Sequence, residues 1–278
     1  MRVDLHMHST ASDGVYSPAE VVQIALTNNM DVIALTDHDS VEGIAEARQA
    51  AASSKLDVLV GVELSSEGDQ GDAHILGYLF DTDNLPLQNL LSELRGARVH
   101  RADRIVQKLS GLGIDVPLER VYALAGSGAV GRPHVARAMV EAGFVGSLQE
   151  AFDKYLGDDG PAYVPHFNLT PEDAIRAVHA AGGIAVLAHP GRYEAYGKII
   201  AGLLPLGLDG LEVFYPDHTP AIIEELRGIV RQHDLVMTVG SDFHRREGDG
   251  SARIGSVKTP PDLAIVAALR ERTLRYRQ

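Results

Sequence analysis

The sequence of 278 residues contains no cysteine. This absence excludes disulfides, thiolate nucleophiles, iron–sulfur clusters and thiolate zinc sites. No apolar run approaches the roughly 18 residues that a membrane span requires, and no secretory hydrophobic segment follows Met1. We therefore expect a cytoplasmic protein that has no membrane partner.

Basic residues are also scarce, with 25 Lys and Arg against 38 Asp and Glu, for a formal net charge of −13. Such a surface should repel long nucleic acids, because their binding depends on neutralising phosphates. DNA is therefore not an expected partner. An anionic substrate would have to be attracted by bound cations or by a local cluster of arginines.

The pattern of apolar runs predicts an α/β fold. Short apolar strands alternate with helices in both the first and last parts of the chain, which is typical of a parallel sheet with buried strands. Ser17-Pro18-Ala19-Glu20 has the N-cap, proline and glutamate that open a helix. The predicted strands are 2–5, 32–35, 58–62, 75–79, 184–188, 210–214 and 236–239.

The alternation stops in the middle of the chain, where only helices are predicted. These helices cover 87–110, 117–125, 132–142 and 147–156. We interpret 1–85 as the first part of a barrel, 86–165 as a helical insertion that caps the substrate, and 166–278 as the second part. The count of seven strands is one short of a standard eight-unit barrel.

Polar residues of metal-binding type follow these strands repeatedly. In a parallel barrel such positions open onto the carboxyl-terminal face, where active sites lie. Independent surface histidines would have no reason to recur there. The residues are His6, His8, Asp37, His38, Glu63, His189, Asp242 and His244.

In two places the spacing of these residues would allow a pair of side chains to bind the same metal ion. His6 and His8 are two residues apart on an extended segment and therefore point the same way. Asp242 and His244 repeat that spacing, and Glu63 could bridge two ions. Imidazole with carboxylate suits zinc, manganese or iron. Two or more such ions supply what phosphoester hydrolysis needs.

The motifs resemble those of the PHP (polymerase and histidinol phosphatase) family. Asp4-Leu5-His6-Met7-His8-Ser9 with Ser12-Asp13-Gly14 is similar to the family's opening motif. Leu35-Thr36-Asp37-His38-Asp39, Ala188-His189-Pro190 and Gly240-Ser241-Asp242-Phe243-His244 resemble the three that follow. Gly61-Val62-Glu63 and His74 also fall where the family has ligands.

The resemblance implies a distorted seven-stranded (β/α) barrel with a trinuclear metal site, which we expect to hold three Mn²⁺, with Fe²⁺, Zn²⁺ or Mg²⁺ also compatible. His6, His8, Glu63 and Asp242 would hold one metal; Glu63, His74 and His189 the second; Asp13, His38 and His244 the third. Asp37 is interpreted as a partner that orients an imidazole, and Asp39 as a turn residue.

Within the family, the helical insertion with Gly131-Arg132-Pro133-His134 is most similar to the 3′,5′-nucleotide bisphosphate phosphatases. The resemblance implies removal of the 3′-phosphate from nucleoside 3′,5′-bisphosphates and, in relatives, 5′-to-3′ trimming of short 5′-phosphorylated RNA. A hydroxide bridging the metals would attack the phosphorus. Asp13, Asp242 and His244 are the catalytic candidates, and His244 or a metal-bound water would protonate the leaving ribose oxygen.

Several arginines are candidate substrate contacts. Arg98 and Arg101 lie on one predicted helix and could clamp a second phosphate, although a solvated helix face explains them equally well. Arg132 and His134 begin another helix, a natural site for a phosphate. Arg192 lies beside the predicted ligand His189.

Other polar and aromatic residues have less definite roles. His179, His218 and His233 are interpreted as surface residues, His166 is undecided, and Glu212 follows a strand but matches no ligand position. An aromatic side chain should stack on the base, and the sequence does not choose among the candidates. These are Tyr163, Phe167, Tyr193 and Tyr215.

Two alternatives stay open. A histidinol-phosphate phosphatase would use the same metals but needs only one phosphate site. A metal-binding regulatory module without turnover would bind metal and release no phosphate. The oligomeric state is not predicted.

Overall fold

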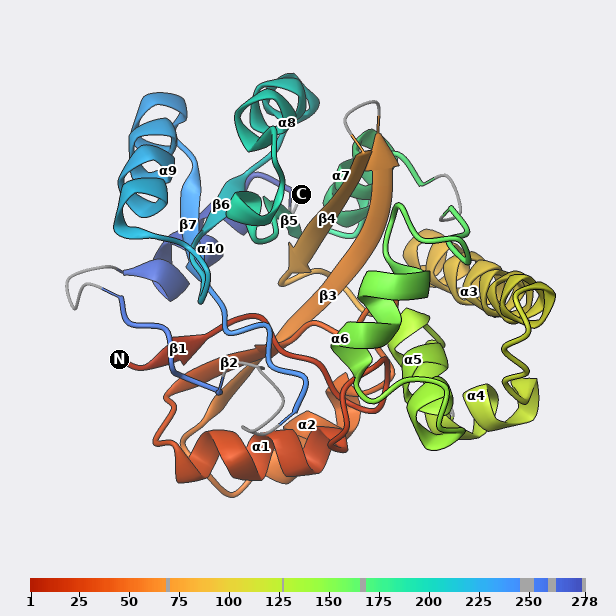
Figure 1. Cartoon of the computed structure of the whole chain (residues 1–278). Helices are drawn as coiled ribbons and strands as arrows, with labels where there is room; N and C mark the ends of the chain where they lie inside the picture. The colour runs from red at the N-terminus through yellow and green to blue at the C-terminus, as the bar shows by residue number, and fades with distance from the viewer. Residues whose placement is uncertain (69–70, 127, 166–168, 246–252, 260–263, 277–278) are drawn as a thin grey trace.

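The computed structural model describes residues 1–68, 71–126, 128–165, 169–245, 253–259 and 264–276. Seven strands form one sheet in chain order, which curls into a nearly closed barrel (Figure 1). Its edges meet where the Leu5 amide donates to the Val239 carbonyl, at 2.9 Å, and where Met7 pairs with Phe243. The predicted seven-stranded α/β barrel is thus confirmed. The strands are β1 (Val3–Asp4), β2 (Val32–Leu35), β3 (Asp57–Gly68), β4 (Gly71–Tyr78), β5 (Ile184–Leu187), β6 (Gly210–Phe214) and β7 (Val236–Val239).

The direction of β4 corrects the expectation of a parallel sheet, because β4 is antiparallel to both β3 and β5. Only two residues separate β3 from β4 in the chain, whereas a parallel crossover needs a dozen or more. The reversal explains why His74 comes before its apolar run. The beginning of β4 lies at the edge of the sheet where the parallel strands end.

Helices lie around the outer face of the sheet (Figure 1). The first begins as predicted: the Ser17 hydroxyl accepts from the Glu20 amide, and the Glu20 carboxylate accepts from the Ser17 amide. These helices are α1 (Pro18–Thr27), α2 (Ile44–Ala51), α7 (Pro171–Ala180), α8 (Tyr196–Leu203), α9 (Pro220–His233) and α10 (Ile265–Thr273), with 3₁₀ turns η2 (Pro190–Arg192) and η3 (Leu204–Leu206). No helix within the described ranges is long and apolar enough to span a bilayer.

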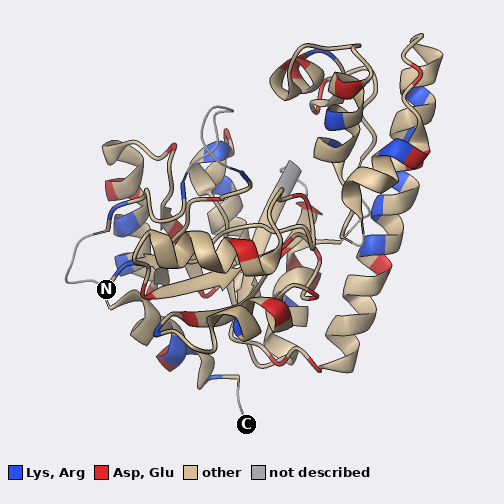
Figure 2. Ribbon diagram, turned by 90° about the horizontal axis from the view of Figure 1, so that it is seen from below, with Lys and Arg blue, Asp and Glu red and all other residues tan. Residues whose placement is uncertain are grey.

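Between β4 and α7 the helices of the described chain stand beside the barrel, as expected for the predicted helical segment (Figure 2). The long helix α3 joins two cores: Leu91 packs in the barrel core, whereas Ile105 packs in a separate cluster formed by the insertion. That separate core supports the three-part division of the chain, which stays a prediction. The helices are α3 (Leu85–Gly111), α4 (Leu118–Ala125), α5 (Arg132–Glu141), α6 (Leu148–Ala151) and the π-helix η1 (Phe152–Leu156).

Candidate metal centre

The predicted metal ligands gather at one edge of the barrel. His6 follows β1, His38 follows β2, His189 follows β5 and Asp242 follows β7. Parallel strands bring their carboxyl ends to one face, so these distant segments meet there. Glu63 reaches the same face from inside a strand, since β3 continues to Gly68 instead of ending at Val62 as predicted.

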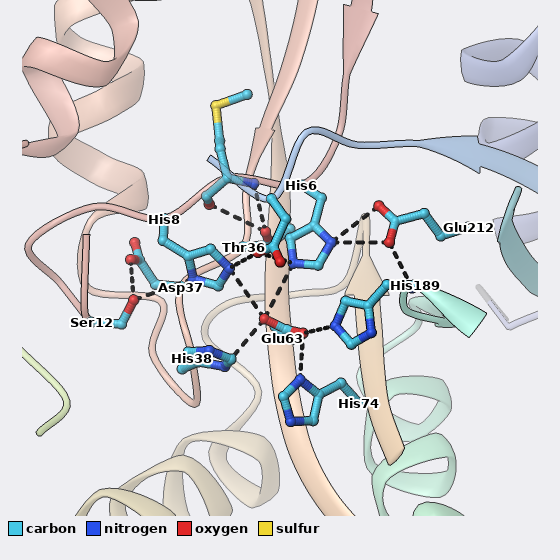
Figure 3. Close-up of polar contacts among 12 residues, drawn as sticks. His6, His8, Ser12, Thr36, Asp37, His38, Glu63, His74, His189 and Glu212 are labelled. Carbon is cyan, nitrogen blue, oxygen red and sulfur yellow. Dashed lines mark hydrogen bonds and ion pairs between the residues drawn. The ribbon is translucent and has the colours of Figure 1, made fainter. Parts of the chain in front are cut away.

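Glu63 lies at the centre of this cluster, and five imidazoles point toward it (Figure 3). Its Oε2 is 3.2 Å from three ring nitrogens: Nε2 of His6, Nε2 of His8 and Nδ1 of His38. Its Oε1 is 2.7 Å from Nδ1 of His74 and 3.2 Å from Nε2 of His189. Each oxygen thus faces its own set of nitrogens, an arrangement suited to a carboxylate that bridges two cations.

Asp242 supplies a second carboxylate to the same point. Its Oδ1 is 3.4 Å from Nε2 of His6 and 3.2 Å from Nε2 of His8. Atoms that bind one ion at about 2.0–2.2 Å in tetrahedral geometry lie about 3–3.5 Å apart. The spacing of His6, His8, Glu63 and Asp242 therefore fits one divalent cation.

The facing atoms also lack hydrogen bonds. Among the described residues, Nε2 of His6, Nε2 of His8, Nδ1 of His38 and Oε2 of Glu63 are buried and have no hydrogen-bond partner. They approach one another without hydrogen-bond geometry. Because buried polar atoms are nearly always satisfied, these residues fit a bound divalent metal.

Two further groups could hold a metal. One contains His8, Asp13, His38 and His244, and the other His38, Glu63 and His74, with the donor atoms of each group within 4.8 Å of one another. All nine predicted ligands therefore lie in or beside one cluster. The group with Glu63 and His74 contains His38 in place of the predicted His189, whose Nε2 lies 3.2 Å from Oε1 of Glu63, and the division into three ions stays a prediction.

The charges of the cluster favour cations. Although burial opposes ionisation, the surrounding imidazoles hold the pKa of Glu63, Asp13 and Asp242 well below the usual range. Burial lowers the pKa of His8, but the facing carboxylates of Asp242 and Glu63 outweigh it and raise this pKa to about 10. The carboxylates are therefore ionised, and a proton on His8 competes with a metal ion for its ring nitrogen.

Glu212 fixes two of the ligands and had no role assigned from sequence. Both of its oxygens lie near Nδ1 of His6, at 3.0 and 3.2 Å, and Oε2 also accepts from the His189 amide at 2.7 Å. Holding Nδ1 leaves Nε2 of His6 facing the metal position. The chain passes so closely here that a Cβ on Gly240 would lie 2.2 Å from Glu212 and His6. The sequence did contain one sign of this role, because an acidic residue is unusual within an apolar, buried strand such as Gly210–Phe214.

Asp37 and Asp39 act differently from each other. Asp37 accepts from the Ser12 hydroxyl at 2.6 Å, and Ser12 lies 3.5 Å from Nδ1 of His8, so Asp37 acts on that imidazole through Ser12. Asp39 was expected to be only a turn residue. It is buried and pairs with Nε of Arg98 at 2.6 Å. That expectation was wrong, because the partner of Asp39 comes from the distant insertion.

The metal ligands and the insertion share one cavity of about 580 Å³, a size typical of small-ligand sites. Its wall includes His74, Asp242 and His244 on the barrel side. Three arginines of the insertion also line it, namely Arg98, Arg101 and Arg132. Figure 2 shows basic bands along α3, the helix that contributes two of these arginines.

The three arginines differ in their contacts. Arg98 is bonded to Asp39 and to the Ser65 hydroxyl, at 2.7 Å for the latter, so it attaches the insertion to the barrel. Arg101 and Arg132 each place the guanidinium 5.8 Å from the centre of the Tyr163 ring, within the range of cation–π attraction. Tyr163 thus contacts both arginines through its ring.

Two tyrosines among the base-stacking candidates have bonded hydroxyls. The Tyr215 hydroxyl donates to Oδ2 of Asp242 at 2.9 Å and accepts from Arg192 at 3.2 Å. The Tyr193 hydroxyl accepts from the His74 amide at 2.9 Å. Both therefore support the metal centre. Phe152, which was not a candidate, lines the cavity, whereas Phe167 and His166 lie outside the described residues.

Two histidines occupy unexpected places. His134 is buried, and its Nδ1 accepts from the Gly131 amide at 3.0 Å. Burial lowers its pKa to about 4, so the ring is neutral. It is absent from the residues that line the cavity, and its bond to Gly131 caps the helix; its contact with substrate stays a prediction. His218 is buried as well, which corrects its interpretation as a surface residue; His233 is exposed as predicted.

Known proteins resemble this chain over most of its length. The PHP domain profile matches residues 4–109. The chain is 39% identical over 247 residues to a 5′-3′ exoribonuclease of Haemophilus influenzae, covering 87% of this chain and 90% of that protein. It is 34% identical over 266 residues to a 3′,5′-nucleoside bisphosphate phosphatase of Chromobacterium violaceum, covering 94% and 93%.

A solved structure is similar to this chain over nearly its whole length. A predicted metal-dependent phosphoesterase from Bifidobacterium adolescentis superposes with a TM-score of 0.88 and 30% identity, over 99% of this chain and 96% of that one. The match therefore includes the insertion as well as the barrel. The chain belongs to the PHP family.

Proposed function

We propose that this chain is a metal-dependent phosphoester hydrolase that removes the 3′-phosphate of nucleoside 3′,5′-bisphosphates, for example converting adenosine 3′,5′-bisphosphate to AMP. One observation supports this most directly. The cluster of metal-binding residues and three arginines of the insertion line the same cavity. A molecule with two phosphates can use both groups, one at the cluster and the other at the arginines.

The nine residues described above would hold the metal, with Glu63 as the shared carboxylate. Three Mn²⁺ are proposed, because the donor atoms form three overlapping groups and carboxylate oxygens suit this ion. When bound, such cations lower the pKa of a coordinated water and neutralise phosphate charge.

The residues of the chain orient and hold the substrate. Arg192 lies beside Asp242, with its NH1 3.5 Å from Oδ2, and lines the cavity, so it is placed to contact the phosphate at the cluster. Arg101 and Arg132 are placed to contact the other phosphate. The ring of His244 lies near the Asp242 carbonyl through Nδ1, at 2.9 Å, and near Asp13 through Nε2, at 3.2 Å. This favours Nε2 as a ligand atom; donation of a proton to the ribose oxygen stays a prediction for His244.

A second candidate is the trimming of short 5′-phosphorylated RNA from its 5′ end. The similarity to the Haemophilus influenzae exoribonuclease favours it. Both activities need a phosphoester at the cluster and a second phosphate at the arginines. They differ in whether a further nucleotide extends beyond the cavity. The net charge of −13 disfavours long nucleic acids in either case.

The test is phosphate release from adenosine 3′,5′-bisphosphate with added Mn²⁺, run beside histidinol phosphate and a short 5′-phosphorylated RNA. We expect rapid release with AMP as the product. Cleavage of the RNA to mononucleotides with slow bisphosphate turnover would favour the second candidate. Turnover of histidinol phosphate alone would contradict the assignment of the arginines. No release from any of the three, with metal bound, would contradict hydrolysis.

A further inference from the structure

His218 is a buried imidazole outside the metal cluster, between the end of β6 and the turn that follows β5. Its Nδ1 lies 2.9 Å from the Val213 carbonyl, and its Nε2 accepts from the Gly191 amide at 3.0 Å. A carbonyl only accepts and an amide N–H only donates, so both bonds require a proton on Nδ1 and a lone pair on Nε2. The two contacts thus specify one neutral tautomer.

The turn is packed tightly against this ring. A Cβ on Gly191 would lie 2.6 Å from Cδ2 of His218, so only glycine permits the approach. Two residues earlier, His189 has a φ of +32°, in the left-handed region that non-glycine residues rarely adopt. Such a conformation persists only where the surroundings impose it. The amide of His189 is held by Glu212 and that of Gly191 by His218.

This short turn supplies three residues to the site. His189 points its Nε2 at Glu63, 3.2 Å from Oε1. Arg192 contacts Tyr215 and Asp242. Tyr193 accepts from the His74 amide. A shift of the turn would therefore move a predicted ligand, a predicted phosphate contact and the support of a second ligand together.

We propose that His218 is a positioning residue for the metal centre: through its Nδ1–H and Nε2 it ties the Pro190–Arg192 turn to the end of β6 and so fixes His189 and Arg192. The proposal rests on the proposed metal centre but not on the identity of the substrate. It predicts that the two hydrogen bonds of the ring, and not its volume alone, set the metal affinity.

The test compares His218→Phe with His218→Gln. Phenylalanine keeps a ring of similar size but makes neither bond, whereas the glutamine amide can accept from Gly191 and donate to Val213. Mn²⁺ binding is measured by calorimetry and by the electron paramagnetic resonance of free Mn²⁺, without substrate. We expect His218→Phe to weaken the most affected site about 10- to 100-fold, as loss of a ligand's supporting bond does, and His218→Gln to restore most of that loss.

The matched control is His179→Phe. His179, interpreted from the sequence as a surface residue, is in fact partly buried and bonded to Asp209 at 2.8 Å. Asp209 precedes β6 and so lies at the opposite end of the barrel from the metal centre. This control should lower the melting temperature without changing Mn²⁺ affinity. Should His218→Phe not fold, Gly191→Ala tests the same contact, because its methyl group would displace the turn, and an equal loss of affinity is expected.

Wild-type Mn²⁺ affinity in His218→Phe would overturn the proposal, as would equal losses in His218→Phe and His218→Gln. A loss in His218→Phe no larger than that in His179→Phe would overturn it as well, since the effect would then be one of stability. Metal affinity is measured without substrate, so the result holds even where the bisphosphate proves not to be the substrate.

Discussion

The barrel rim, by which we mean the edge of the barrel where the predicted metal ligands lie, faces the insertion across one cavity. The two regions are built in opposite ways. At the rim, buried carboxylates and imidazoles converge on Glu63 and few of their facing atoms are hydrogen-bonded. On the insertion side, arginines enter the cavity already in contact with other groups, such as Asp39 for Arg98 and Asp158 for Arg132. The rim is thus suited to binding cations, and the insertion to binding an anion while staying attached to the barrel.

This difference suggests that the two regions have different functions. The rim contains every predicted metal ligand and should determine whether a phosphoester is hydrolysed at all. The insertion contributes no predicted metal ligand and should determine which phosphoester is preferred. Substitutions in the two regions should therefore have different signatures, and the predictions below are ordered by the size of their effect.

The largest effect is expected at the centre of the rim. Glu63→Gln should lower kcat/KM for every phosphoester by at least about 10³-fold, since bound metal contributes several kcal/mol to the transition state. Phosphate release and bound metal are measured together. Glu172→Gln, at an exposed residue of α7 paired with Arg176, is the control and should leave both unchanged. Near-normal activity of Glu63→Gln would contradict the metal centre.

On the insertion side, the double substitution Arg101→Gln, Arg132→Gln should lower kcat/KM for the bisphosphate about 10²-fold, because each charge-assisted bond to phosphate contributes roughly 1.5–3 kcal/mol. Activity on a simple monophosphate ester should change by less than about threefold. Arg98 is left intact, because its removal would leave buried Asp39 unpaired.

The control for that pair is Arg104→Gln, an exposed residue on the same helix, which should leave both rates unchanged. Equal losses on both substrates in the double variant would mean that these arginines do not select the bisphosphate.

A smaller effect is expected at Glu212, which is not a predicted ligand but bonds to the predicted ligands His6 and His189. Glu212→Gln keeps the shape of the side chain but removes its negative charge and replaces one of the two oxygens that face Nδ1 of His6 with a donor, so it should hold the His6 ring less firmly. We expect a 10- to 100-fold loss of metal affinity, measured by calorimetry. Unchanged affinity would show that the orientation of these rings does not depend on Glu212.

The smallest effect is expected from a change of pH. In the metal-free protein the pKa of His8 is raised to about 10, so the ring holds a proton through the neutral range and that proton must leave when metal binds. Metal affinity should therefore rise with pH up to about 10, by about tenfold per unit for each proton released. Calorimetry in two buffers of different ionisation enthalpy counts these protons. A metal affinity that does not change with pH would show that metal binding releases no proton from His8, which contradicts this prediction.

Much of the rim could be predicted from the sequence, because its ligands occur in short motifs. The spacing of His6 and His8 and the positions of His189 and Asp242 after apolar strands were enough to place them together. The direction of β4 was missed, since an apolar run looks the same in either direction. The two-residue connection to β3 could have revealed it.

The remaining errors concern partners distant in sequence. Asp39 and Arg98 are 59 residues apart, and Glu212 and His6 are 206 apart. A short sequence pattern cannot predict such a contact, because each residue alone resembles an ordinary polar residue in a turn or on a helix. The same reasoning explains His218, whose two partners are backbone groups with no signature in sequence.

The most direct test of this division of tasks is the ratio of kcat/KM for adenosine 3′,5′-bisphosphate to kcat/KM for a simple monophosphate ester, measured in Mn²⁺ for two variants side by side. In Arg101→Gln, Arg132→Gln the ratio should fall by more than about tenfold, following the contributions given above. In Glu212→Gln it should stay within about threefold of wild type, since both substrates depend on the same metal. A ratio that falls in the rim variant and is preserved in the insertion variant would contradict the account.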